Sequence, residues 1–140
     1  MSLVIDSSIT LAWYFEDEQT EASTAVLHSV ADTGAMVPAL CRLEVANGLQ
    51  MAVRRRRITA DYRDASLNDL RSLAIEIDRE TEVHAWSATL GLAERHGLTL
   101  YDAAYLELAV RFRRPLATFD RELIKAAHAD KVELVGVVAP

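Results

Sequence analysis

Short apolar runs alternate along the chain with longer stretches in which apolar residues recur every three or four positions. The run Leu3-Val4-Ile5 predicts a buried strand that ends at Asp6. Further short runs predict strands at 35–37, 74–77, 116–119 and 132–138. Helical spacing predicts helices at 18–31, from about 40 to 57, 59–73, 83–96, 103–112 and 121–129.

This alternation of strands and helices predicts an α/β fold. A strand followed by a helix and a second strand is the unit from which parallel sheets are built, with helices on both faces. We therefore expect one domain over residues 1–140, a three-layer sandwich around a parallel sheet of about four to five strands. No internal repeat or linker interrupts the pattern.

Composition and charge limit which classes of protein this chain can belong to. Half of the residues are apolar and no apolar run approaches the roughly 20 residues needed to cross a bilayer, so we expect a cytoplasmic protein without a membrane partner. The formal net charge of −6 argues against tight nucleic-acid binding through phosphate neutralisation alone. That objection weakens if several of the acids converge on one site and hold cations.

Several common kinds of site are missing from the sequence. The single cysteine, Cys41, has no partner for a disulfide, and the four histidines are scattered without metal-ligand spacing. No phosphate-binding GxxxxGK[ST] loop and no dinucleotide-binding GxGxxG motif is present. The candidate chemistry therefore rests on the acidic residues.

Four acids follow predicted strands or begin predicted helices. Asp6 and Asp120 come directly after short apolar strands, Glu44 lies near the start of the helix after the second strand, and Asp102 lies at the amino end of a helix. In open parallel sheets the ligand site forms outside the carboxyl ends of the strands. We therefore expect these four carboxylates to converge there.

A carboxylate cluster without basic partners predicts a metal site. Like charges a few ångströms apart repel one another unless protons or cations compensate. Oxygen ligands suit Mg²⁺ or Mn²⁺, which also bind phosphate oxygens, so the cluster indicates phosphodiester chemistry. Each acid also has a structural interpretation: Asp6 and Asp120 as helix N-caps, Asp102 as a complement to a helix dipole, and Glu44 as a surface residue.

Three further features have two open interpretations. Ser8 and Thr118 each lie two residues from a strand-end aspartate, where they either position it or cap and pack locally. The run Arg54-Arg55-Arg56-Arg57 either tracks an RNA backbone or is a solvated helix end.

Four segments together resemble the PIN-domain family, specifically the VapC-type toxins of bacterial toxin-antitoxin pairs. They cover essentially the whole chain and are, in order, Val4-Ile5-Asp6-Ser7-Ser8 with Ala12-Trp13, then Leu43-Glu44-Val45-Ala46-Asn47, then 98–105, and finally 116–120. The resemblance implies a metal site of Asp6, Glu44, Asp102 and Asp120, with Ser8 and Thr118 as neighbouring polar groups. It also implies that Asn47 supports Glu44.

The same resemblance implies a Mg²⁺- or Mn²⁺-dependent endoribonuclease that acts as a toxin and inhibits translation. The implied partners are an RNA substrate, a cognate antitoxin protein and a second copy in a homodimer. Trp13, Tyr14 and Phe15 would then belong either to a partner or base-stacking surface or, as we favour, to the core. Tyr101 and Tyr105 share this ambiguity.

Two functions of other classes remain possible from the sequence. The acids could bind metal without turnover in an RNA- or partner-binding module. A receiver-like phospho-accepting domain also uses a parallel sheet and an acidic pocket, but it needs an adjacent acidic pair that Asp6-Ser7-Ser8 lacks.

Overall fold

The computed structural model describes residues 2–136, which form a parallel sheet with helices on both sides. The four strands lie in the order β3-β2-β1-β4, and every neighbouring pair is parallel. Val4 of β1 lies opposite Met36 of β2 on one side and Leu116 of β4 on the other. The strands are β1 (Leu3–Ile5), β2 (Ala35–Val37), β3 (Ile75–Ile77) and β4 (Leu116–Ala117).

Helices account for most of the remaining chain. They are α1 (Ser7–Ala12), the 3-10 turn η1 (Glu16–Glu18), α2 (Glu21–Thr33), α3 (Cys41–Arg54), α4 (Ala60–Ser72), the π-helical segment η2 (Ala85–Thr89), α5 (Leu90–His96), α6 (Leu100–Phe112) and α7 (Arg121–Ala129). No helix within residues 2–136 is long and apolar enough to cross a membrane.

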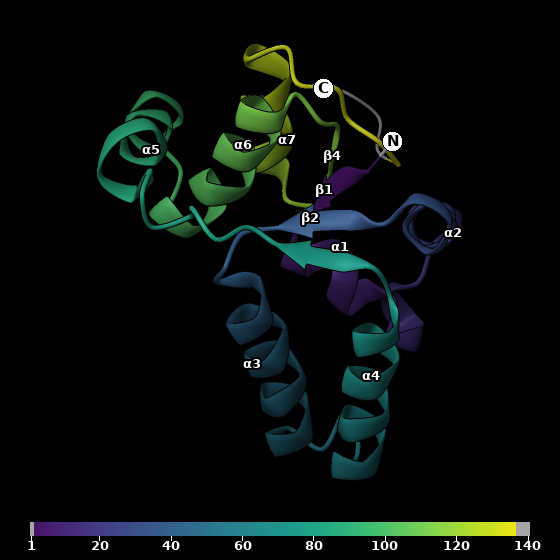
Figure 1. The fold of residues 1–140 in the computed structure, drawn as a ribbon. Coiled ribbons are helices and arrows are strands. Elements are labelled where there is room, and N and C mark those ends of the chain that lie inside the picture. Colours follow the sequence, from purple (N-terminus) through teal and green to yellow (C-terminus); the bar gives the residue numbers. More distant parts are fainter. Residues whose placement is uncertain (1, 137–140) are drawn as a thin grey trace.

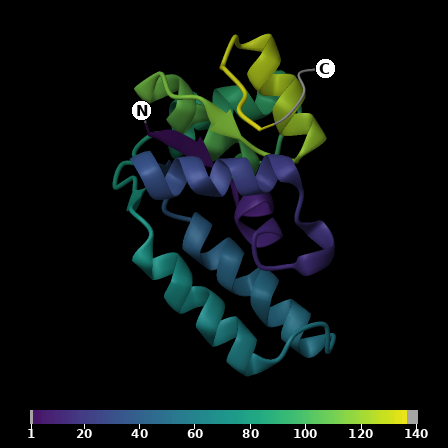
Figure 2. The ribbon, with the colours of Figure 1, turned by 90° about the vertical axis from the view of Figure 1, so that its right-hand side faces the viewer.

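The helices form two layers around the sheet. Helices α5, α6 and α7 cover the upper face in Figure 1, whereas α1 and the hairpin of α3 and α4 lie below it. The hairpin of α3 and α4 extends well beyond the sheet. Helix α2 lies beside the ends at which the strands begin, and Figure 2 shows this helix along its whole length. This arrangement confirms the predicted three-layer α/β fold with a four-stranded sheet.

Capping side chains explain where several helices begin. The hydroxyls of Thr20, Thr59 and Thr99 each accept a hydrogen bond from a backbone N–H in the first turn of the helix that follows. Such a cap satisfies a donor that the helix leaves unpaired. The helix predicted at 18–31 therefore starts at Glu21, and the one predicted at 103–112 starts three residues earlier, at Leu100.

The strand predicted at 132–138 is wrong in its described part. Residues 132–136 contain only an isolated parallel bridge between Leu116 and Leu134. The backbone of Gly136 is left-handed, with φ of 76°, and this conformation ends the extended stretch. Positions 137 and 138 of that prediction lie outside the described residues.

The apolar stripe at 83–93 forms a helical segment, but most of it faces outward. Val83, Trp86 and Leu90 are exposed, and Trp86 is 92% exposed. The π-helical turn at Ala85–Thr89 changes the helical phase, so Leu92 and Ala93 are the residues that reach the core.

Core packing fixes α1 and the residues after it against the rest of the molecule. Trp13, Tyr14 and Phe15 are buried, which confirms that these aromatic residues are core residues. A Cβ atom at Gly48 of α3 would lie 2.6 Å from a methyl carbon of Leu11, so glycine permits α1 and α3 to approach closely. This contact brings α1 and α3 close together at Gly48.

A buried ion-pair cluster ties α6 to the end of β3. The Arg111 guanidinium donates to Asp78 at 2.6 Å and 3.2 Å and to Glu107 at 2.8 Å and 2.9 Å. Both carboxylate side chains are almost completely buried. Arg111 therefore neutralises two charges that would otherwise be buried without a partner.

We predict that Arg111→Met lowers the free energy of unfolding by about 3 kcal/mol or more, because it leaves Asp78 and Glu107 buried and unpaired. Urea unfolding at neutral pH measures the change. The matched control is Arg95→Met, which removes an exposed ion pair with Asp130 and should cost less than about 1 kcal/mol. Equal effects of the two substitutions would contradict the assignment.

Candidate active site

The strand order places a topological switch at β1. From β1 the chain passes through α1 and α2 to β2 on one side, whereas β4 lies on the other side. Connections diverge at such a point, and the space outside the strand ends becomes available to ligands. Asp6 follows β1 directly, and Asp120 follows β4 after two residues.

Asp6 is a buried carboxylate held by three donors. Its Oδ1 accepts from the Ser8 hydroxyl at 2.7 Å and from the backbone N–H of Ile9 at 3.1 Å. Its Oδ2 accepts a short hydrogen bond from the Thr118 hydroxyl. The side chain is therefore the N-cap of α1, and its orientation is fixed by the first turn of α1 together with Thr118 from the loop after β4.

Ser8 and Thr118 also connect the β1 and β4 ends. The Ser8 hydroxyl accepts from the Phe119 N–H at 3.1 Å, and the Thr118 hydroxyl accepts from the Asp120 N–H at 3.0 Å. Asp120 in turn caps α7, because its Oδ1 accepts from the Leu123 N–H at 2.9 Å. The two hydroxyls thus hold both aspartates in one hydrogen-bonded unit, and the capping and site interpretations of these acids are compatible.

Glu44 reaches the site from the first turn of α3. Its Oε1 accepts a 2.5 Å hydrogen bond from the hydroxyl of Tyr105, a residue of α6 that is only 1% exposed. Tyr105 follows Asp102 by three residues, so the two share one face of α6. The hydroxyl of Tyr105 therefore anchors Glu44 next to the helix that carries Asp102.

Tyr105 is the site residue to which the sequence analysis gave no definite role. The short phenolic hydrogen bond to Glu44 is a tertiary contact between residues 61 positions apart, and no local motif predicts it. The three-residue spacing of Tyr105 from Asp102 is the one sequence feature that places Tyr105 on the same helix face as a predicted site residue. Asn47 is exposed one turn after Glu44, and within the described residues it makes no hydrogen bond to the carboxylates.

Burial, and then repulsion between neighbouring carboxylates, disfavours the charged forms of three of the four acids. Burial raises the pKa of Asp6 to about 6, and the charge of Asp120 contributes. Burial also raises the pKa of Asp102, with Asp120 adding to it, and the pKa of Glu44, with Asp102 adding to it. Within residues 2–136 none of the four acids forms an ion pair.

These residues fit a hard divalent cation by their chemistry. All four donors are carboxylates, and a cation would offset both the burial and the mutual repulsion that raise the pKa values of Asp6, Glu44 and Asp102. Among the described residues no three acidic, histidine or cysteine side chains already form a set able to hold a metal ion. Mg²⁺ commonly binds through one or two carboxylates and retains several waters, so such an open arrangement suits it.

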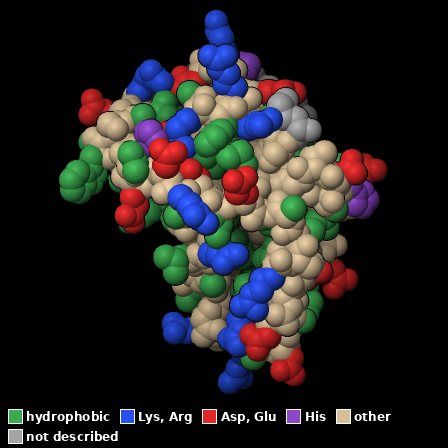
Figure 3. All heavy atoms as spheres, in the orientation of Figure 1, with side chains coloured by type: hydrophobic (Ala, Val, Ile, Leu, Met, Phe, Trp, Pro, Cys, Tyr) green, Lys and Arg blue, Asp and Glu red, His purple; other side chains and the backbone are tan. Residues whose placement is uncertain are grey.

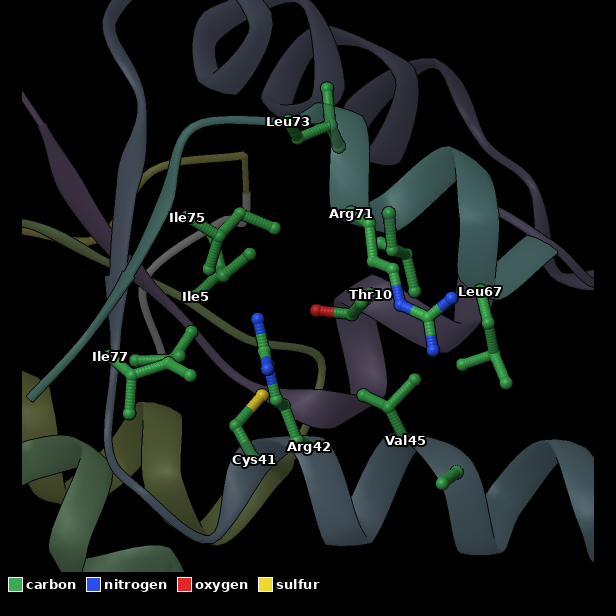
Figure 4. Close-up of a pocket in the computed structure, with 13 residues that line it drawn as sticks. Ile5, Thr10, Cys41, Arg42, Val45, Leu67, Arg71, Leu73, Ile75 and Ile77 are labelled. Carbon is green, nitrogen blue, oxygen red and sulfur yellow. The ribbon is translucent and has the colours of Figure 1, made fainter.

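A separate cavity of about 290 Å³ lies between the α3–α4 hairpin and the sheet. None of its 13 lining residues is one of the four acids. Figure 4 shows aliphatic side chains around it, with Cys41 at its base and Arg42 and Arg71 directed toward it from the two helices. Burial raises the pKa of the Cys41 thiol to about 11, so this cysteine is not a ready nucleophile.

The structure is that of a parallel α/β protein whose buried acid Asp6, with Asp120 nearby, lies at the switch point of the sheet. A family model described as the PIN domain matches residues 3–129, from β1 to the end of α7. The chain therefore belongs to the PIN-domain family, in its VapC branch.

The chain is similar to "Ribonuclease VapC3" of Pyrobaculum aerophilum, with 32% identity over 127 residues that cover 88% of this chain and 92% of that protein. Three solved structures share its fold. PAE2754 from Pyrobaculum aerophilum has a TM-score of 0.67 at 23% identity and covers 90% of this chain and 79% of that chain. FitAcB from Neisseria gonorrhoeae has a TM-score of 0.64 at 15% identity and covers 95% of this chain and 96% of that chain. VapBC2 from Rickettsia felis, bound to a DNA fragment from their promoter, has a TM-score of 0.63 at 14% identity and covers 96% of this chain and 97% of that chain.

The raised pKa of Asp6 predicts how stability depends on pH when divalent cations are chelated. The folded state binds the Asp6 proton more tightly than the unfolded state, so the contribution of Asp6 to stability falls as pH rises from about 4 to about 6. Asp6→Asn keeps a good N-cap and cannot ionise. We expect it to be more stable than the wild type near pH 7, by up to about 3 kcal/mol.

Urea unfolding of both proteins in chelator, from about pH 4 to 7, measures this difference. The advantage of Asp6→Asn should shrink toward zero at the acidic end. An advantage that stays constant across this range would show that Asp6 is not the titrating group.

Proposed function

We propose that this protein is a divalent-metal-dependent endoribonuclease, the toxin of a toxin-antitoxin pair, that hydrolyses phosphodiester bonds of RNA in the cytoplasm. The observation that carries the proposal is the buried Asp6 carboxylate, held by Ser8 and Thr118 among carboxylates that have no cationic partner in residues 2–136. The 32% identity to a protein named as a ribonuclease supports RNA as the substrate.

We assign Asp6, Glu44, Asp102 and Asp120 as the residues that would hold Mg²⁺ or Mn²⁺. When bound, the cation supplies positive charge to the phosphate oxygens and makes water a better nucleophile. The protein's own part is positioning. Thr118 and Ser8 keep Asp6 in one orientation, and Tyr105 does the same for Glu44.

Positioning of this kind matters because a preorganised site need not reorient its charges during the reaction. The hydroxyls of Ser8 and Thr118, which donate to Asp6, also accept from the backbone of the loop that carries Asp120. The orientation of Asp6 is therefore tied to the position of Asp120. Hydrolysis by this arrangement requires few groups other than carboxylates.

The proposed partners follow from the relatives. The similar structures include a toxin-antitoxin complex from Klebsiella pneumoniae and VapBC2 of Rickettsia felis, so we propose that a cognate antitoxin protein neutralises this chain. A homodimer is part of the same proposal.

We predict that Asp6→Asn and Asp102→Asn each abolish RNA cleavage, by at least about 100-fold, because each removes one negative charge from the metal site. The assay is cleavage of labelled total RNA by purified protein with Mg²⁺ or Mn²⁺ and with chelator. Discrete fragments should appear only with the wild type and the cation.

The matched control is Asp61→Asn, which makes the same change on an exposed position of α4 and should leave cleavage unaltered. Cleavage by either site variant at the wild-type rate would refute the assigned site. Absence of cleavage under every condition by a folded wild type would favour a binding module.

A further inference from the structure

The four arginines 54–57 at the end of α3 form two groups. Arg57 turns back onto the protein: its guanidinium lies 4.1 Å from the centre of the Phe15 ring and donates to Asp17 and Glu18 at 2.6 Å each. Arg54, Arg55 and Arg56 are exposed, and within residues 2–136 their side chains have no hydrogen bond or ion pair. We call these three residues the arginine tip.

The backbone of the arginine tip is held in place by α3. The N–H groups of Arg55 and Arg56 donate to the carbonyls of Met51 and Val53 at 3.0 Å each. Arg56 adopts a left-handed conformation with φ of 58°, which turns the chain toward α4. Three cationic side chains thus project from a fixed turn into solvent.

The arginine tip is a local reversal of the charge of the chain. Residues 54–64 contain five arginines and two aspartates, whereas the whole chain has a net charge of −6. Figure 3 shows several Lys and Arg side chains at the lower end of the hairpin, farthest from the sheet, with some acidic side chains beside them. A concentration of positive charge on an otherwise acidic protein favours a polyanion at that place.

Helix α3 carries a residue of the acidic site near its beginning and a residue of the arginine tip at its end. Glu44 and Arg54 belong to the same helix and are separated by ten residues, or about 15 Å along its axis. Asn47 follows Glu44 by one turn and precedes Arg54 by two turns, so the exposed Asn47 and Arg54 lie along one side of α3, next to the side that carries Glu44.

We propose that the arginine tip binds the phosphate backbone of the RNA substrate a few nucleotides away from the bond that is cut. This inference rests on the proposed function. An RNA strand that leaves the carboxylates along the exposed side of α3 reaches Arg54, Arg55 and Arg56, which supply the positive charge that the acidic site lacks. The contacts are to phosphates, so they add affinity without reading sequence.

The test compares RNA binding by three chains that all carry Asp6→Asn to prevent cleavage. The first has no further change, the second carries Arg54→Gln, Arg55→Gln and Arg56→Gln, and the third carries Arg113→Gln, Lys125→Gln and Lys131→Gln. The three control residues are also exposed and lack ion pairs in residues 2–136, and their substitution removes the same charge. They lie elsewhere in the fold: Arg113 at the end of α6, Lys125 on α7 and Lys131 in the turn after α7. The probe is fluorescently labelled poly(U), titrated at several salt concentrations.

Removing the arginine tip should weaken poly(U) binding at low salt by about tenfold or more and reduce the slope of log K against log salt by about 2, at roughly 0.7 per single-strand phosphate contact. The control should change the slope much less. With Asp6 restored, the tip variant should show a raised KM for RNA and an unchanged kcat. Because all substituted side chains are exposed, the thermal midpoints should agree.

A tip variant that matches the control in affinity, slope and KM would overturn this inference while leaving metal-dependent cleavage by the wild type intact. A wild type that neither binds nor cleaves RNA would overturn the proposed function as well. The two failures are therefore distinguishable.

Discussion

Burial of the Asp6 carboxylate is the constraint on which the site depends. A carboxylate removed from water needs hydrogen-bond donors or a cation. The donors here are the Ser8 hydroxyl, the Ile9 N–H and the Thr118 hydroxyl, and they come from the start of α1 and from the loop after β4. These bonds do not fully offset the cost of burial, since the pKa of Asp6 remains raised to about 6. The charged form of Asp6 therefore remains disfavoured by burial, and a cation bound beside it would reduce this cost.

The same hydrogen bonds connect the carboxyl ends of β1 and β4, where Asp6 and Asp120 lie. Thr118 and Ser8 each donate to Asp6 and accept from the backbone of the β4 loop, so the ends of two parallel strands are joined by side chains beyond the last backbone pair. Tyr105 provides the corresponding link between α6 and α3 through Glu44. Polar contacts therefore link the end of β1 to the end of β4 and link α6 to α3, while the apolar core beneath them holds the layers together.

The sequence predicted those features that depend on local patterns. Asp6 and Asp120 could be placed at strand ends because a short apolar run and a helix start surround each of them. The Val83, Trp86 and Leu90 stripe correctly indicated a helical segment, but a π-helical turn shifts the phase and leaves these residues exposed. The pairing of Tyr105 with Glu44 and of Arg57 with Asp17 joins residues at least 40 positions apart, and such contacts follow from packing that periodicity does not encode.

Charge separation along α3 reconciles an acidic protein with a polyanionic substrate. A group of carboxylates repels phosphate, and a bound cation would offset this repulsion only locally. The helix carries Glu44 in its first turn and Arg54 in its last, and the basic end also lies where the helix dipole is negative. Opposite charges are thus held about 15 Å apart by one rigid element, close enough to act on one strand and too far apart to neutralise each other. A shorter α3 would bring Arg54 within ion-pair range of Glu44 and compete with the cation for that carboxylate.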